Sequence, residues 1–465
     1  MTLAAMSLGF AVVQLDVTIV NVAINAIGTS FGASLSALQW VVSAYTITFA
    51  ALILSAGALG DRIGAKRLFM AGFTIFTGAS LACALAPNLA MLIAARAVQG
   101  VGAAVLVPNS LALLNHVYRE DGSRRRAVAI WAAGASLALT AGPLIGGALI
   151  AITGWRSIFL VNLPIGLVGL WLTARYAVET PRSSSQRLDW LGQTAAILAL
   201  GCLGAASIES GPLGWSDPRI ITGVIAAFAS IAAFLWVERT VTHPMLPLSL
   251  FRNSSFAATS AVGLLVNAAF YGLIFVFSLY FQRIQHLSPL WTGIAFAPMT
   301  GAVLATNLVA ARVTNLIGPR LAVAAGTAAV AVGCLALLGI RAGSNYWSLL
   351  LQLVAMGAGL GLLVPPLTST LLASVPKTQS GIASGVLNSM RQTGSVIGVA
   401  LLGSLIAQNS DFIAGTRMAL ELSALALAGA CVAVLTGVHE RTRHENYFDG
   451  TVGVRGCRSS CNCHT

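Results

Sequence analysis

Gly57-Ala-Leu-Gly-Asp-Arg-Ile-Gly-Ala-Lys-Arg67 joins two long apolar runs of the sequence, at 38–60 and 68–87. Each run has the length of about 20 apolar residues that a helix needs to cross a bilayer. A similar junction, Ala311-Arg-Val-Thr-Asn-Leu-Ile-Gly-Pro-Arg320, follows a later apolar run and also ends in a glycine and a basic residue. Two such junctions in corresponding places predict two copies of one membrane bundle.

The composition extends this prediction to the whole chain. Of the 465 residues, 57% are hydrophobic and only 9% are charged, whereas soluble domains carry roughly 25% charged residues. The sequence therefore predicts an all-α membrane protein with about fourteen spans and no room for a sizeable soluble domain. The predicted spans are 3–26, 38–60, 68–87, 90–113, 126–150, 157–175, 191–209, 219–237, 256–281, 291–312, 319–340, 346–371, 382–407 and 419–438.

The spans divide into groups of six, two and six. We expect an N-terminal six-helix bundle in 1–175, two inserted helices with their linkers in 176–255, a C-terminal six-helix bundle in 256–438 and a cytoplasmic tail in 439–465. Most of the 26 lysine and arginine residues fall in alternate loops. By the positive-inside rule, this places both termini in the cytoplasm. The net charge of +12 is therefore explained by membrane topology and does not indicate nucleic-acid binding.

Asp16 is the acidic residue that the spans place deepest, about midway along 3–26. A carboxylate at the bilayer centre costs roughly 2.5–3.5 kcal/mol on insertion scales, so such residues tend to be functional. We expect Asp16 to gain and lose a proton, Arg96 to pair with it, and Gln99 to lie one helical turn beyond Arg96. The alternatives are a structural ion pair at Asp16 and an Arg96 that bonds only backbone carbonyls.

Two further stretches have chemistry of their own. Gly134, Ala138, Gly142 and Gly146 recur every four residues in the fifth span and predict a helix face that another helix approaches closely. Ordinary helix packing explains this stripe equally well. In the first junction, Asp61 beside Gly64 can pair with arginines or a helix N-terminus of the other bundle and hold one side closed; a solvated loop whose charges only set topology is the alternative.

Together these stretches resemble the major facilitator superfamily, and within it the fourteen-helix drug:proton antiporter branch. The resemblance implies two six-helix bundles plus two extra central helices, with gating by the first junction. It rests on Leu15-Asp-Val-Thr-Ile-Val-Asn-Val-Ala23, the junction 57–67, Arg96-Ala-Val-Gln-Gly-Val-Gly-Ala-Ala104 and Gly142-Pro-Leu-Ile-Gly-Gly147. The implied gating residues are Gly57, Asp61, Arg62, Gly64 and Lys66, and the implied antiporter motif, typical of export, is Gly134, Gly142, Pro143, Gly146 and Gly147.

A substrate cavity is predicted from a face of the span 256–281 where Asn267, Phe270 and Tyr271 follow helical spacing, because such a polar and aromatic face suits amphipathic ligands. Aromatic residues that face lipid are the alternative. With one deep acid, neutral or monocationic substrates fit better than doubly charged cations. The candidates are Asn21, Trp40, Tyr45, Asn267, Phe270, Tyr271 and Asn388.

We therefore expect a proton-coupled antiporter in the cell membrane that exports small amphipathic molecules by alternating access and functions as a monomer. Its partners would be the substrate, protons and the lipid bilayer, without nucleic acid. No cofactor or metal site is expected, because Cys457, Cys461, Cys463 and His464 do not have a zinc-site spacing, and no nucleotide-binding or hydrolase motif occurs. A narrow-substrate metabolite exporter, an uptake symporter and a non-transporting receptor or scaffold are the alternatives, and an enzyme is not expected.

Overall fold

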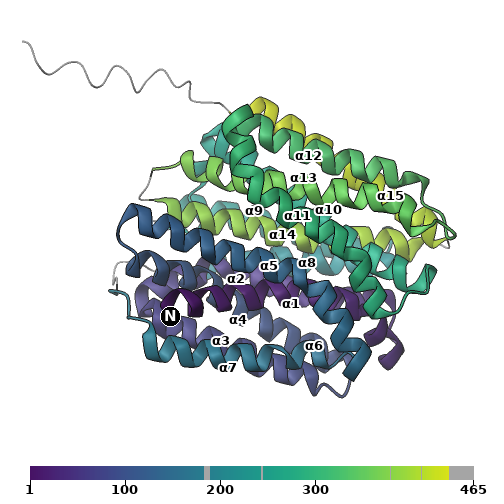
Figure 1. Cartoon of the computed structure of the whole chain (residues 1–465), viewed down its shortest axis with the longest axis horizontal. Helices are drawn as coiled ribbons and strands as arrows, with labels where there is room; N and C mark the ends of the chain where they lie inside the picture. The colour runs from purple at the N-terminus through teal and green to yellow at the C-terminus, as the bar shows by residue number, and fades with distance from the viewer. Residues whose placement is uncertain (183–188, 242–243, 377–378, 410, 439–465) are drawn as a thin grey trace, which may run out of the picture.

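The computed structural model describes residues 1–182, 189–241, 244–376, 379–409 and 411–438, and within these ranges the secondary structure is helical (Figure 1). Fourteen of the described helices are long and apolar enough to cross a membrane, as predicted. The cysteine-rich tail and Lys377 lie outside the described residues. The helices are α1 (Thr2–Phe31), α2 (Leu35–Ile63), α3 (Ala65–Ala84), α4 (Leu89–Val117), α5 (Asp121–Thr153), α6 (Ser157–Leu160), α7 (Asn162–Tyr176), α8 (Trp190–Leu213), α9 (Pro218–Thr240), α10 (Ser254–Leu279), α11 (Pro289–Ile317), α12 (Pro319–Ala336), α13 (Tyr346–Ala373), α14 (Ser380–Gln408) and α15 (Phe412–Gly437).

Polar caps and glycines, more than hydrophobicity, determine where these helices end. Ser34 accepts a hydrogen bond from the backbone of Ala37, and this cap starts α2 three residues before the predicted run. Gly64, with φ of 109°, forms the sharp turn between α2 and α3. The span 157–175 is divided at Val161 into α6 and α7, which still form one crossing, Ser157–Tyr176.

The helices α1–α7 and α10–α15 form two halves with the same packing pattern. In the first half α1 packs on α5, and α4 packs on both α2 and α3. In the second half α10 packs on α14, and α13 packs on both α11 and α12. The two halves therefore repeat one bundle, and they meet along α2 with α14 and along α5 with α11.

Hydrogen bonds between the halves gather toward one end of the bundle. We call the end where α1 begins and α2 finishes the near end, and the end where α1 finishes and α2 begins the far end. Toward the far end, Ser278 Oγ donates to the Asn21 carbonyl at 2.5 Å, Gln282 Nε2 to the Val22 carbonyl at 3.0 Å, and Gln39 Nε2 to the Val399 carbonyl at 2.9 Å. The halves are thus closed together at the far end.

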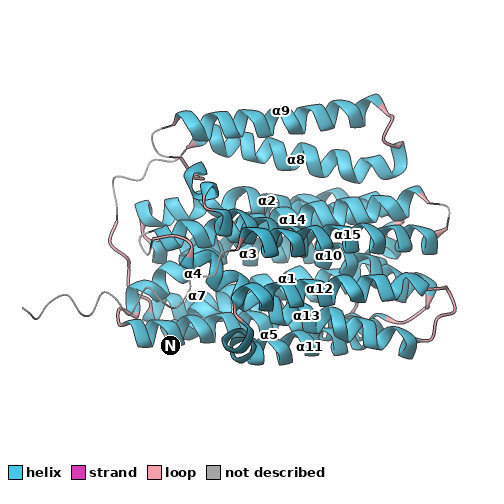
Figure 2. Ribbon diagram, turned by 90° about the horizontal axis from the view of Figure 1, so that it is seen from above, coloured by secondary structure: helices cyan, strands magenta, loops and turns pink. Residues whose placement is uncertain are grey.

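The inserted helices α8 and α9 form a separate layer over one side of the molecule (Figure 2). α8 packs against α2 and α14 at once, and α9 packs mainly on α8. Gln193 Nε2 of α8 donates to the Ala51 carbonyl of α2 at 2.9 Å, and Gln408 Nε2 of α14 donates to the Ser210 carbonyl of α8 at 2.9 Å. α8 therefore bridges the two halves.

Candidate functional site

The predicted pair of Asp16 and Arg96 lies at the centre of a buried polar cluster. Arg96 Nη1 is 2.5 Å from Asp16 Oδ2, and the two side chains are 1% and 0% exposed. Gln99 Nε2 donates to Asp16 Oδ1 at 2.9 Å and also receives a hydrogen bond through its Oε1, from Arg96 Nη1 at 2.7 Å. These contacts neutralise two charges that would be costly if they were buried alone.

Two members of this cluster, Ser80 and Asn162, are absent from the sequence-based set. Asn162 Nδ2 donates to Asp16 Oδ1 at 3.1 Å and lies 3.3 Å from Ser80 Oγ, which also accepts from Gln99 Nε2 at 2.8 Å. Asn162 begins α7, and its role becomes visible only when α7 is seen beside α1. Ser80 carries no signal of its own, because serine is common in membrane helices.

Aromatic rings and a backbone carbonyl hold the other side of the Arg96 guanidinium. Its Cζ lies 4.3 Å from the centre of the Tyr45 ring and 5.9 Å from that of Phe159, distances at which a cation is attracted to a ring face. Arg96 Nε donates to the Val41 carbonyl at 3.1 Å. Arg96 thus joins α2 and α4 to the carboxylate of α1, so a change at Asp16 is felt in three helices.

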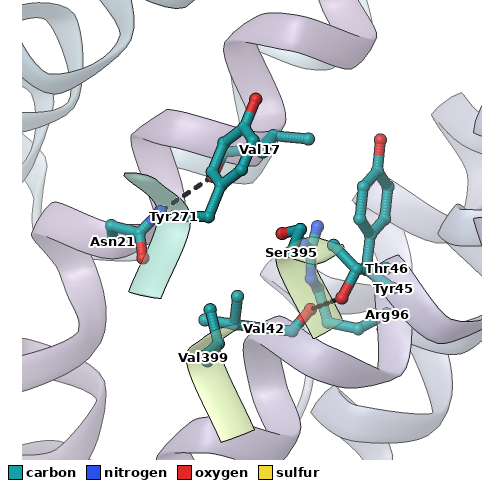
Figure 3. A pocket seen from close by; sticks show the side chains of 9 residues that line it. All are labelled: Val17, Asn21, Val42, Tyr45, Thr46, Arg96, Tyr271, Ser395 and Val399. Carbon is teal, nitrogen blue, oxygen red and sulfur yellow. Dashed lines mark hydrogen bonds between the residues drawn. The ribbon is translucent and has the colours of Figure 1, made fainter. Parts of the chain in front are cut away.

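A narrow pocket beside this cluster lies between the two halves (Figure 3). The enclosed space does not admit even a water-sized molecule, whereas ligand sites typically measure roughly 300–1,000 Å³. The pocket in this closed arrangement is therefore smaller than a drug-sized ligand requires. Helices α1, α2 and α4 of one half and α10 and α14 of the other provide its lining: Val17, Asn21, Val42, Tyr45, Thr46, Arg96, Tyr271, Ser395 and Val399.

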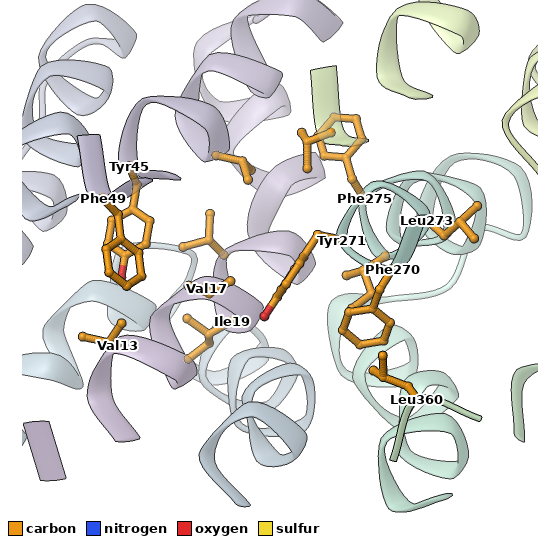
Figure 4. Close-up of a cluster of buried hydrophobic side chains, with 14 of the residues drawn as sticks. Val13, Val17, Ile19, Tyr45, Phe49, Phe270, Tyr271, Leu273, Phe275 and Leu360 are labelled. Carbon is orange, nitrogen blue, oxygen red and sulfur yellow. The ribbon is translucent and has the colours of Figure 1, made fainter. Parts of the chain in front are cut away.

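Of the seven predicted cavity residues, Asn21, Tyr45 and Tyr271 line this pocket. Trp40 instead points away from it, and its indole Nε1 donates to Glu209 Oε1 of α8 at 2.8 Å. Phe270 lies in the hydrophobic core that joins the halves, next to Tyr271 (Figure 4).

The remaining two cavity candidates, Asn267 and Asn388, are half-buried. Each donates from its amide to a backbone carbonyl four residues earlier in its own helix, Gly263 and Ser384 respectively.

The small residues of α5 face two different neighbours. A Cβ built on Gly146 would lie 2.7 Å from Ile19 Cγ1, and one on Gly134 would lie 3.8 Å from Ser7, so this stripe packs against α1, the helix that carries Asp16. Gly142 also faces α1, at Thr18. The motif continues to the other half, because a Cβ on Gly147 would lie 2.5 Å from the Pro289 carbonyl oxygen of α11.

Pro143 takes part in the same contact between the halves. It lies inside α5, and its carbonyl faces Gly293 of α11, where a side chain would not fit. Glycines on both helices thus let α5 and α11 approach closely toward the far end.

The junction between α2 and α3 is anchored within the first half by Glu179, which the sequence analysis did not select. Its carboxylate accepts from the backbone N–H of Lys66 at 2.9 Å and of Arg67 at 3.3 Å, the first turn of α3. The Lys66 ammonium also donates to the Ala174 carbonyl at 3.1 Å. A carboxylate at a helix N-terminus is favoured by both the free N–H groups and the helix dipole.

Of the other predicted gating residues, Gly64 faces this anchor, since a Cβ there would lie 2.6 Å from Glu179 Cδ. Asp61 and Arg62 are exposed, and among the described residues neither takes part in an ion pair. A Cβ on Gly57 would lie 3.7 Å from Pro108 of α4, so this glycine faces its own half.

Comparison with known proteins agrees with this arrangement. The family model of the Major Facilitator Superfamily matches residues 6–399, and the chain belongs to this family of membrane transporters. It is 38% identical to the multidrug resistance protein Stp of Mycobacterium tuberculosis over 88% of this chain and 76% of that one. It is 36% identical to the methylenomycin A resistance protein of Bacillus subtilis over 95% of both chains.

A third relative is the tetracenomycin C resistance and export protein of Streptomyces glaucescens, which is 31% identical over 87% of this chain and 76% of its own length. Among solved structures, the human organic anion transporter MFSD10 (TETRAN) superposes with a TM-score of 0.64 at 17% identity, covering 93% of this chain and 98% of that one. At this identity the superposition establishes the fold alone. The fold and family expected from the sequence are thus confirmed.

Proposed function

We propose that this protein is a proton-coupled antiporter of the cell membrane that exports small amphipathic molecules. The observation that carries the proposal is Asp16, a buried carboxylate that shares a cluster with Arg96, while Arg96 itself lines the pocket between the halves. A proton taken up by Asp16 removes its charge and therefore its hold on Arg96. Proton binding and the shape of the pocket are coupled through this one guanidinium.

The orientation of the protein follows from its basic loops. The near end carries the junction 57–67 and the basic residues at the start of α5, so the near end faces the cytoplasm together with both termini. The halves are closed at the far end, as an inward-facing state requires. In alternating access, the junction residues Asp61 and Arg62 would contact the second half when the near end closes.

The relatives support export as the direction of transport, since they are named for resistance to multiple drugs, methylenomycin A and tetracenomycin C. The proton gradient supplies the energy, without a bound cofactor or metal. The substrate, protons and the surrounding lipid are the partners, and one chain contains the whole path, so it works as a monomer.

The test compares Asp16→Asn with wild type in proteoliposomes, with ethidium and chloramphenicol as cationic and neutral probes. A proton gradient imposed across the membrane should drive substrate in the opposite direction, with matching proton flux, and Asp16→Asn should reduce both to background. Glu421→Gln is the control, because Glu421 is exposed on α15. Coupled flux that survives in Asp16→Asn would refute this proton site.

Folding and direction are checked separately. Asp16→Asn leaves the Arg96 charge buried without its partner, which costs about 3–5 kcal/mol. The double variant Asp16→Asn/Arg96→Gln removes both charges and should fold while remaining uncoupled. Substrate and protons that move in the same direction would identify an uptake symporter, and the absence of any movement would identify a receptor or scaffold.

A further inference from the structure

Arg391 of α14 is a cation in the interior of the second half, and no described carboxylate pairs with it. Its Nη2 donates to Thr368 Oγ1 of α13 at 3.0 Å. Among the described residues this is its one hydrogen bond, and it takes part in no ion pair. Arg96 differs in this respect, because Asp16 neutralises its charge. An uncompensated charge at this depth is costly and is kept where it meets a ligand or water.

The position of Arg391 on α14 places it in line with the pocket. Ser395 and Val399 line the pocket between the halves (Figure 3), and Arg391 precedes them by four and eight residues, on the same helix face. Arg391 therefore extends this lining by one turn toward the near end. Its side chain is half-buried.

Neutral polar residues lie about one turn toward the near end from Arg391 and from several pocket residues. On α10, Asn267 lies one turn before the pocket residue Tyr271, and on α14 Asn388 lies one turn before Arg391; both are half-buried. On α1, Gln14 precedes the pocket residue Val17 by three residues and is also half-buried. The faces that continue the pocket toward the near end thus offer hydrogen-bonding amides around one positive charge.

We propose that Arg391 recognises an anionic group of the exported molecule, with a carboxylate as the chemistry that fits best. A guanidinium presents a planar fork of N–H donors that binds a carboxylate through two parallel hydrogen bonds. Four of its five N–H groups remain for such a ligand, because Thr368 takes one. The side-chain amides of Asn267 and Asn388 then contact the polar remainder of the substrate, while Tyr271 and Tyr45 contact its apolar part.

This assignment rests on the proposed export function and narrows it. Neutral or monocationic substrates were expected from the acidic residues alone, without the charge of Arg391. Since the charges of Asp16 and Arg96 cancel, Arg391 supplies the net charge in the region one turn beyond the pocket. A cation would be repelled there, whereas an anion gains a partner. One proton entering for each monoanion that leaves moves two net positive charges inward per cycle, against one for a neutral substrate.

The experiment uses a matched pair of probes, nalidixic acid and its primary amide, with ethidium as the cation. Wild type in proteoliposomes should export the acid with an affinity roughly 10- to 100-fold better than the amide, the range expected for a charge-assisted pair. Arg391→Gln should abolish this preference and improve ethidium export. Arg391→Lys should retain part of it, because the charge remains but the planar fork is lost.

Controls separate this effect from misfolding. Arg312→Gln removes an exposed arginine of α11 in the same half and should leave the preference for the acid unchanged, and the melting temperature of every variant is recorded. The transport current per exported molecule should be twice as large for the acid as for the amide.

Equal affinity for acid and amide in wild type, or an unchanged preference in Arg391→Gln, would overturn the assignment. Export of the amide and ethidium without the acid would also overturn it and would leave export itself standing. Failure of a proton gradient to move any of the three compounds would instead count against the proposed function.

Discussion

The contact between Gly147 and α11 makes the closure at the far end testable with one added methyl group. A Cβ at Gly147 would lie 2.5 Å from the Pro289 carbonyl oxygen and 2.9 Å from Leu290 Cα, whereas non-bonded carbon atoms prefer about 3.5–4.0 Å. Both contacts are to backbone, which cannot turn aside as a long side chain would. Gly147→Ala therefore requires α5 and α11 to move apart by most of an ångström.

The cost of this overlap falls only on the state that is closed at the far end. Overpacking of this kind costs about 1–3 kcal/mol, which corresponds to a shift of roughly 5- to 150-fold in the ratio of two conformations. We expect Gly147→Ala to favour the outward-facing state by this factor. Gly301→Ala on α11 is the matched control, because a Cβ there would have no atom within 4 Å.

Cysteine labelling measures the shift. Ser278 is fully buried between the halves toward the far end, so Ser278→Cys in a background without other cysteines reports opening of that end. A membrane-impermeant maleimide applied from the far side should react roughly 5- to 150-fold faster in Gly147→Ala than in the parent or in Gly301→Ala. Equal rates in all three proteins would show that the two halves do not close through this contact.

Three further predictions concern the residues that support the site. Glu179→Gln weakens the cap of α3 and should destabilise the protein by about 0.5–2 kcal/mol, measured as a fall in the melting temperature, whereas an unchanged value would show that the cap is dispensable. Asn162→Ala removes one hydrogen bond to the Asp16 carboxylate, worth about 1.5–3 kcal/mol for a charged partner. Coupled flux in proteoliposomes should fall at least about 10-fold at an unchanged yield of folded protein, and wild-type flux would contradict the assigned role. Trp40→Phe leaves Glu209 without its indole donor and should lower the melting temperature with little effect on substrate affinity, while a large change in affinity would place Trp40 at the substrate.

The spans and the repeat of the bundle were predictable because both depend on local properties of the sequence. A run of about 20 apolar residues can do little except cross the bilayer as a helix. The helix ends were less predictable, since Ser34 and Gly64 set them through a cap and a turn that hydropathy does not register.

The core of the candidate site was partly predictable for the same reason. Asp16 and Arg96 are conspicuous as charges in apolar runs, whereas Ser80 and Asn162 are ordinary polar residues until α1, α3, α4 and α7 bring the cluster together. Trp40 was predicted for the cavity as an aromatic residue of a membrane span, but the indole faces α8. The direction of a side chain around a helix depends on neighbours that are distant in the sequence.

The position of α8 makes the two seams between the halves unequal. One seam, between α2 and α14, is covered by α8 and then by α9, and hydrogen bonds from Gln193 and Gln408 fasten this cover to both halves. The other seam, between α5 and α11, has no such cover among the described helices. A hydrophobic molecule dissolved in the bilayer would therefore meet a shielded flank on one side and an open one on the other. Any entry of substrate from the lipid is therefore confined to the flank built from α5 and α11.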